Sequence, residues 1–100
     1  MAKLSEVVAD AVTPAEFDLT GVGFNYGNLY SIQLVLTGYT SGTFNVNVKV
    51  KGSDTYSRLQ KVTPTGGLAV FNVTGYYDYI QLEPLTLVGT TDYVAYLASA

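Results

Sequence analysis

The sequence predicts an all-β protein, an antiparallel jelly-roll-like β-sandwich of seven or eight strands with a short N-terminal arm. The clearest observation is the segment 43–51, TFNVNVKVK, in which apolar and polar residues alternate strictly. A half-buried strand requires such alternation, because successive side chains leave opposite faces of the sheet. Turns containing glycine or proline recur about every ten residues, which is typical of sandwiches and barrels rather than of βαβ units. An even number of strands behind an arm favours the jelly roll.

Residues 1–13 differ from the rest of the chain because their apolar residues have helical spacing. These residues are Leu4, Val7, Val8 and Ala11. A helix of this length is marginal alone in water, so we expect an arm, either a short helix or an extended chain, that becomes ordered against a neighbour. A frayed terminus is the alternative interpretation. Pro14 ends this segment, and residues 14–100 are predicted to form a single β-sandwich domain.

The remainder contains eight short stretches rich in apolar, β-branched and aromatic residues, which we predict to be strands. They are residues 15–20, 29–36, 43–51, 56–62, 68–73, 76–83, 85–88 and 93–98. Residues 21–28, rich in glycine and asparagine, are predicted to be a loop. Pro84 separates two of the stretches, so 85–88 is predicted to be a short edge segment, where proline is tolerated.

The alternation in segment 43–51 also predicts which side chains face the core. Val46 and Val48 are expected to point inward, and Asn45 and Asn47 are expected to point to solvent. On this assignment, truncation of Val46 should destabilise the protein far more than truncation of Asn47.

The composition argues against several classes of function. The chain has no histidine and no cysteine, so it lacks the commonest general base, every disulfide and thiolate nucleophile, and most zinc sites. Its eight carboxylates stand mostly at predicted strand ends and turns, and no Asp-x-Asp-x-Asp calcium loop occurs. We therefore predict a protein that is not an enzyme and has no catalytic residues, no cofactor and no metal site.

The charge and hydropathy patterns predict a protein that binds neither nucleic acid nor membranes. The net charge is −3, and a nucleic-acid-binding protein needs an excess of positive charge. The four nearby basic residues, Lys49, Lys51, Arg58 and Lys61, are explained by a solvated strand face. No run approaches the ~18 apolar residues of a membrane span. Glu6 and Asp10 interrupt any signal peptide, which predicts synthesis in a cytoplasm without export by the general secretory route.

Surface composition points to protein interfaces instead. Charged residues make up only 13% of the chain, and there are nine tyrosines, a residue that is enriched where proteins meet. The same tyrosines also favour strands, so packing alone accounts for some of them. The candidate interface residues are Leu4, Val7, Val8, Tyr76, Tyr77, Tyr79, Tyr93 and Tyr96.

Three segments together carry a resemblance to a known group of proteins. They are GYTSGTFNV at 38–46, KGSD at 51–54 and FNVTGYYDYIQL at 71–82. Over residues 29–98 the chain resembles small β-sandwich virion structural proteins of tailed bacteriophages, which include capsid decoration (cement) proteins and tail-associated modules. Tyr56 matches the aromatic residue that follows the Gly-Ser turn in such proteins, whereas the absence of tryptophan departs from many sugar-binding relatives.

The resemblance implies a capsid decoration protein that bridges and stabilises neighbouring capsid subunits. Its implied partners are the major capsid protein or other virion proteins, and its implied assembly is a symmetric homo-oligomer, either a trimer or a dimer. It would be made in the host cytoplasm and would lie on the capsid exterior. The alternative is a glycan- or receptor-binding module of a phage tail or fibre, and a non-viral carbohydrate-binding domain ranks third.

Overall fold

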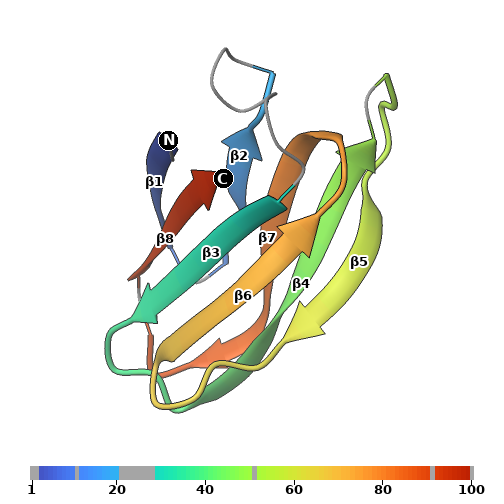
Figure 1. The fold of residues 1–100 in the computed structure, drawn as a ribbon. Coiled ribbons are helices and arrows are strands. Elements are labelled where there is room, and N and C mark those ends of the chain that lie inside the picture. The colour runs from blue at the N-terminus through green and yellow to red at the C-terminus, as the bar shows by residue number, and fades with distance from the viewer. Residues whose placement is uncertain (1–2, 11, 21–28, 51, 91, 100) are drawn as a thin grey trace.

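A computed structural model of the chain describes residues 3–10, 12–20, 29–50, 52–90 and 92–99. These residues form eight β-strands and two antiparallel four-stranded sheets (Figure 1). The strands are β1 (Lys3–Asp10), β2 (Ala15–Asp18), β3 (Leu29–Leu36), β4 (Ser41–Val50), β5 (Ser57–Val62), β6 (Leu68–Thr74), β7 (Tyr77–Val88) and β8 (Asp92–Ser99). The all-β, jelly-roll-like sandwich expected from the sequence is therefore confirmed. The predicted loop 21–28 lies outside the described residues.

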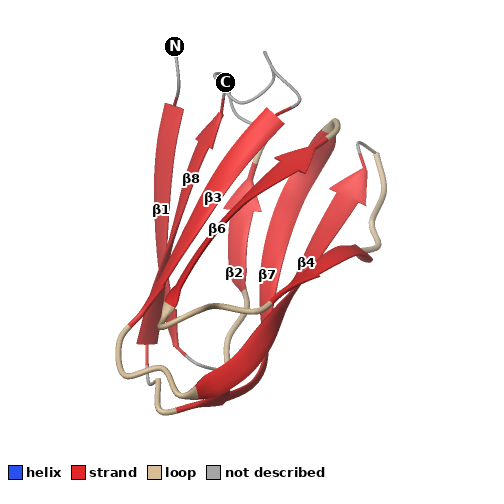
Figure 2. Ribbon diagram, turned by 60° about the horizontal axis from the view of Figure 1, so that its bottom comes forward, coloured by secondary structure: helices blue, strands red, loops and turns tan. Residues whose placement is uncertain are grey.

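The strand order in the first sheet is β1-β8-β3-β6, and in the second it is β2-β7-β4-β5. The two sheets form two layers, with β1, β8, β3 and β6 in one layer and β2, β7 and β4 in the other (Figure 2). Each sheet therefore has one face toward the core and one outer face. The two outer faces are the broad surfaces that the sandwich presents to other molecules.

The core lies between the sheets and is built by strict alternation along the central strands. In β3 every second residue is buried, from Tyr30 to Leu36, and Val46 and Val48 of β4 are buried as expected. The rings of Phe44 and Tyr93 meet edge to face across the core, with centroids 5.1 Å apart and an interplanar angle of 74°. This contact joins β4 of the second sheet to β8 of the first.

The first strand settles the conformation of the N-terminal segment. Of the helix and the extended chain left open by the sequence, the structure shows the extended chain. β1 pairs with β8 of the same chain, from Lys3 opposite Ser99 to Asp10 opposite Asp92. Val7 and Ala9 pack against the core, because in a strand they lie on the same side. That residues 1–13 are a separate arm stays a prediction.

The interruption expected at Pro84 is wrong, because β7 runs without a break from Tyr77 to Val88. The strand accommodates the proline next to a local irregularity. The register between β4 and β7 shifts between Ser41 and Thr43, and Thr86 of β7 has a positive φ of 53°. Proline is compatible with a strand at such bulges, where the hydrogen-bond ladder is already disturbed.

Asn47 departs from the expectation that it would face solvent freely. It points away from the core, as the alternation predicted, yet it is only 8% exposed. Its side-chain amide donates hydrogen bonds to Gln81 and Glu83 of the adjacent β7. Truncation of Asn47 therefore removes partners from a half-buried network, and its cost should be closer to that of truncating Val46 than the sequence indicated.

Candidate interaction surfaces

The outer face of the first sheet is unusually apolar, and we call it the apolar face. One row crosses all four strands, because Val8 pairs with Val94, Val94 with Val35, and Val35 with Leu68. A second row adds Val70 and Tyr96 to the face. Val8 is 66% exposed and Val70 is 71% exposed, so these side chains lie open to solvent.

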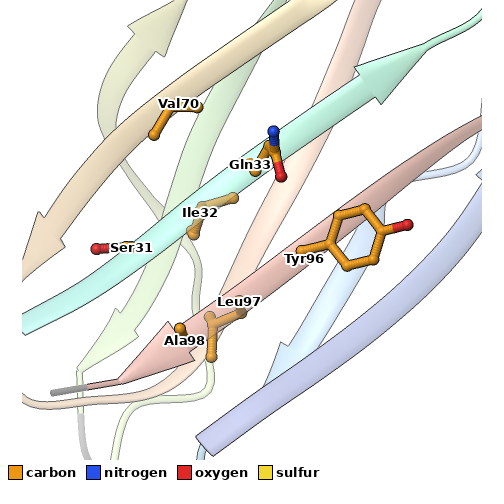
Figure 3. Close-up of a pocket in the computed structure, with 7 residues that line it drawn as sticks. All are labelled: Ser31, Ile32, Gln33, Val70, Tyr96, Leu97 and Ala98. Carbon is orange, nitrogen blue, oxygen red and sulfur yellow. The ribbon is translucent and has the colours of Figure 1, made fainter. Parts of the chain in front are cut away.

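A shallow depression of about 160 Å³ lies on the same face. Figure 3 shows Gln33 on β3 and Tyr96 on the neighbouring β8, with Val70 on the far side of β3. The floor includes Ile32 and Leu97, which are buried in the core. The lining is mostly apolar, so the depression suits an apolar side chain rather than a charged ligand.

Charge is scarce on the apolar face and is entirely negative among the described side chains. Glu6 and Asp10 of β1 and Asp92 of β8 point outward, since their strand neighbours Val7 and Tyr93 point inward. The outward positions of β3 and β6 carry no charged residue. The carboxylates are therefore confined to one side of the face.

The outer face of the second sheet has a different character, and we call it the polar face. Its row Glu16, Gln81, Asn47 and Arg58 runs across β2, β7, β4 and β5. The neighbouring rows add Asp18, Tyr79, Lys49, Glu83, Asn45 and Lys61. The two outer faces of this sandwich thus offer different chemistry to their surroundings.

Side-chain hydrogen bonds tie the centre of the polar face together. The Asn47 Nδ2 donates to Gln81 Oε1 at 2.9 Å and to Glu83 Oε1 at 3.4 Å, and the Asn45 Nδ2 donates to the same Glu83 oxygen at 3.2 Å. The Asn45 Oδ1 is buried without a hydrogen-bond partner among the described residues. The four side chains therefore hold one another in fixed orientations and retain unused hydrogen-bonding capacity.

Aromatic side chains flank this network. The Lys49 ammonium lies 4.5 Å from the ring centroid of Tyr56 and 4.8 Å from that of Tyr79, so it is held between two electron-rich rings. The Tyr56 hydroxyl donates a hydrogen bond to the Glu16 carboxylate. Burial, together with this carboxylate, raises the pKa of the Tyr56 hydroxyl, so it stays protonated as a donor.

The predicted interface residues are distributed over the whole molecule. Val8 and Tyr96 lie together on the apolar face, and Tyr79 lies on the polar face. Tyr76 is exposed in the connection between β6 and β7. Leu4 pairs with Ala98 in β1, and nothing is described of its side chain.

Three of the predicted interface residues pack or form hydrogen bonds within the chain itself. Tyr93 is a core residue that is 1% exposed, and Val7 packs against the core. Tyr77 is partly buried, and its hydroxyl donates to the Thr74 carbonyl at 2.6 Å. A tyrosine at an inward strand position fills the core with its ring, and the sequence alone does not say how its hydroxyl is satisfied.

Sequence reasoning missed Val35, Leu68, Val70 and Val94, which form most of the apolar face. A signal was present: in residues 93–98, YVAYLA, and in 68–71, LAVF, apolar residues occupy consecutive positions. Consecutive apolar residues in a strand place apolar side chains on both faces of a sheet. Such a pattern predicts that the outer face is also covered.

The buried Tyr93 hydroxyl makes a testable link between pH and stability. It donates to the Thr13 carbonyl at 2.8 Å, and burial raises its pKa from 10.0 to about 12. A raised pKa means that folding favours the neutral form, so this contribution is intact below pH 10 and is lost as the pH rises toward 12. Denaturant titrations from pH 7 to 12 measure this effect. Over that interval the free energy of unfolding of Tyr93→Phe should fall by about 2 kcal/mol less than that of wild type.

The matched control is Tyr96→Phe, which removes a hydroxyl from the exposed apolar face. It should follow the wild-type pH profile, because the Tyr96 side chain lies on the surface and the Tyr93 hydroxyl in the core is left intact. Equal alkaline losses for Tyr93→Phe and wild type would contradict the assignment. Burial also raises the pKa of Tyr30, which is present in wild type and in both variants. We therefore expect all three proteins to lose some stability at alkaline pH.

Among the described residues, no group of three or more acidic side chains is placed to hold a metal ion. None of the described segments is a helix that is long and apolar enough to cross a membrane. The arrangement instead offers two ordered outer surfaces, one apolar and one polar.

No protein-family model and no curated protein sequence matches the chain. Solved structures with the same fold do exist. A protein of the disulfide-linked pili that form Bacillus endospore appendages aligns at 18% identity over 99% of this chain and 88% of that one, with a TM-score of 0.51. The SPBc2 prophage-derived protein YomS aligns at 9% identity over 99% and 96% of the two chains, with a TM-score of 0.58.

A family 29 carbohydrate-binding module, in a mutant complexed with mannohexaose, aligns at 11% identity over 97% of this chain and 74% of that chain, with a TM-score of 0.59. At these identities the likeness establishes the fold alone. The chain thus shares its small β-sandwich fold with a pilus protein, a prophage-derived protein and a carbohydrate-binding module.

Proposed function

We propose that this chain is a non-enzymatic structural protein of a bacteriophage virion, a capsid decoration (cement) protein that acts as a symmetric homo-oligomer. The observation that carries the proposal is the apolar face, on which Val8, Leu68 and Val70 are each more than half exposed. Support comes from two structural neighbours, one prophage-derived and one a subunit of pili. In this proposal the protein lies on the capsid exterior and contacts the major capsid protein.

The extent of the apolar face suits a specific contact. Four strands ~4.8 Å apart and about eight residues long cover roughly 500 Å², and two copies would bury about 1,000 Å² together. This is the area of the whole outer face, on which polar side chains such as Ser31, Gln33 and Asn72 accompany the apolar ones. Neighbouring exposed apolar side chains in a soluble protein mark interaction sites. Tyr96 near the centre provides the kind of aromatic anchor that dominates binding energy at protein interfaces.

The occupant that we propose for this face is a second copy of the chain. Face-to-face pairing about a two-fold axis parallel to the strands, between β8 and β3, places β1 of each copy over β6 of the other. Glu6 then faces the uncharged Val70 side chain of the other copy rather than another carboxylate. The acidic side of each copy meets a neutral side, so the pair forms without charge repulsion.

A dimer of this kind explains how a small sandwich stabilises a capsid. Two paired copies carry two identical attachment surfaces that can contact neighbouring capsid subunits at once. The second contact is then intramolecular, so weak individual contacts add up to durable attachment. The protein contributes rigidity and contact area, and its function needs no chemical step.

The test uses the sign of a charge at one position. Val70→Glu should weaken self-association at least about tenfold, because the new carboxylate faces Glu6 of the second copy, whereas Val70→Lys should pair with Glu6 and keep the dimer. Leu59→Glu, on an exposed position of β5 in the other sheet, is the control for adding a carboxylate. Analytical ultracentrifugation measures dimerisation, and electron microscopy measures occupancy on capsids.

The proposal requires that wild type and Leu59→Glu are dimeric and decorate capsids, and that Val70→Glu is a folded monomer with reduced occupancy. Equal dimerisation of Val70→Glu and Val70→Lys would contradict the pairing geometry. A monomeric wild type that decorates capsids fully would overturn the second copy as the occupant. Absence from purified virions would overturn the decoration function itself.

A further inference from the structure

We infer that the polar face is a binding surface for an uncharged carbohydrate, centred on Tyr79, Gln81 and Glu83 of β7. This site lies on the second sheet and is independent of the proposed pairing through the first. The inference rests on three properties of the face: a fixed set of planar hydrogen-bonding groups, partly buried aromatic rings beside them, and a balance of charge among its described side chains.

The planar groups are already oriented. Asn47 donates to both Gln81 and Glu83, and Asn45 donates to Glu83, so each amide and carboxylate is held by a neighbour. Among the described residues, the Gln81 Nε2 and the Glu83 Oε2 have no hydrogen-bond partner. Both side chains are half-buried. A donor beside an acceptor in fixed positions matches adjacent hydroxyls of a sugar, and preorganisation lowers the entropic cost of binding.

The aromatic groups supply the second element of sugar recognition. Tyr79 is two residues from Gln81 on the same face of β7, and its ring shares the Lys49 ammonium with the ring of Tyr56. Because one cation lies between the two rings, their orientation is constrained. Tyrosine presents a flat apolar ring with a polar tip, and the C–H face of a pyranose packs on such a ring while its hydroxyls reach the amides.

The charge on the face argues for a neutral ligand. Among the described side chains of this face, three carboxylates are matched by three cationic side chains. They are Glu16, Asp18 and Glu83 against Lys49, Arg58 and Lys61. Single-stranded nucleic acid also stacks on aromatic rings, but it requires a surplus of positive charge along the groove. A polyol with many hydroxyls and no charge fits both the balance and the amide-rich centre.

The experiment screens the full-length protein against uncharged hexamers of glucose, mannose and N-acetylglucosamine, with sialylated and sulfated glycans as charged comparisons. The affinity for the best neutral glycan is then measured by titration calorimetry. Tyr79→Ala and Gln81→Ala should each weaken this affinity about tenfold or more, because each removes a group that contacts the sugar. Tyr76→Ala makes the same truncation in the exposed connection between β6 and β7 and should leave the affinity unchanged. Tyr96→Ala tests the depression on the apolar face as the alternative site.

Circular dichroism and thermal unfolding confirm that each variant is folded before its affinity is compared. Absence of binding to every neutral glycan would overturn the inference, as would binding of charged glycans alone. Loss of binding in Tyr96→Ala with retention in Tyr79→Ala would move the site to the depression on the apolar face. Because Val70→Glu leaves the polar face intact, the carbohydrate test and the dimer test fail independently.

Discussion

Phe44→Ala is expected to lower the free energy of unfolding by about 3–5 kcal/mol, a large share of the total stability of a domain of this size. Phe44 is fully buried, and its ring makes an edge-to-face contact with Tyr93 of the opposite sheet. Truncation removes buried apolar surface and an aromatic contact, and it leaves a cavity between two sheets that cannot close without moving whole strands.

Urea denaturation at neutral pH measures this loss. Leu59→Ala serves as the comparison because Leu59 is 43% exposed on β5 and makes no part of the core. That variant should change stability by less than about 1 kcal/mol. A loss of under 1 kcal/mol for Phe44→Ala would mean that the two sheets do not pack through this residue.

The second large effect is expected at Gly67, which directly precedes β6 and comes close to the backbone at the end of β3. Gly67 has φ +86°, and a Cβ added there would lie 2.5 Å from the carbonyl oxygen of Leu36. The two residues are also joined by the hydrogen bond from the Leu36 N–H to the Gly67 carbonyl at 2.7 Å. Gly67→Ala therefore adds a clash to the cost of positive φ, and we expect a loss of about 3 kcal/mol or more.

Gly66 provides a matched control one residue away. It also has positive φ, at +62°, but a Cβ added there meets nothing within 4 Å. Gly66→Ala should cost only the conformational term, about 1 kcal/mol. If thermal and urea unfolding gave equal losses for the two variants, the close approach of Gly67 to Leu36 would not be present in solution.

Much of the fold followed from local sequence patterns. In a strand with one buried face, the alternation of apolar and polar residues shows which side chains point to the core. The alternation around Val46 and Val48 predicted the inward side of β4, and the same pattern predicted β3. What local patterns could not reveal was pairing between distant segments. Residues 3–10 fit helical and extended chain equally until β8 is beside them to supply hydrogen bonds.

The candidate surfaces were less predictable for the same reason. Val8 and Tyr96 were expected at an interface, but their position on one face depends on the β1–β8 register, which the sequence does not state. The role of Asn47 depends equally on its pairing with Gln81, thirty-four residues away. Residue type indicated which side chains suit contact or binding, and only sheet topology decided which of them lie together.

The pairing of β1 with β8 brings the two ends of the described chain to one place. Lys3 lies opposite Ser99, and directly opposed residues in antiparallel strands have Cα atoms about 5 Å apart (Figure 1). A short linker could close the chain there, and the turn at Gly66, where there is open space, could be cut instead. Such a circular permutant would keep every strand beside its present neighbours, so the stability of this sandwich resides in strand adjacency and not in the order of connection.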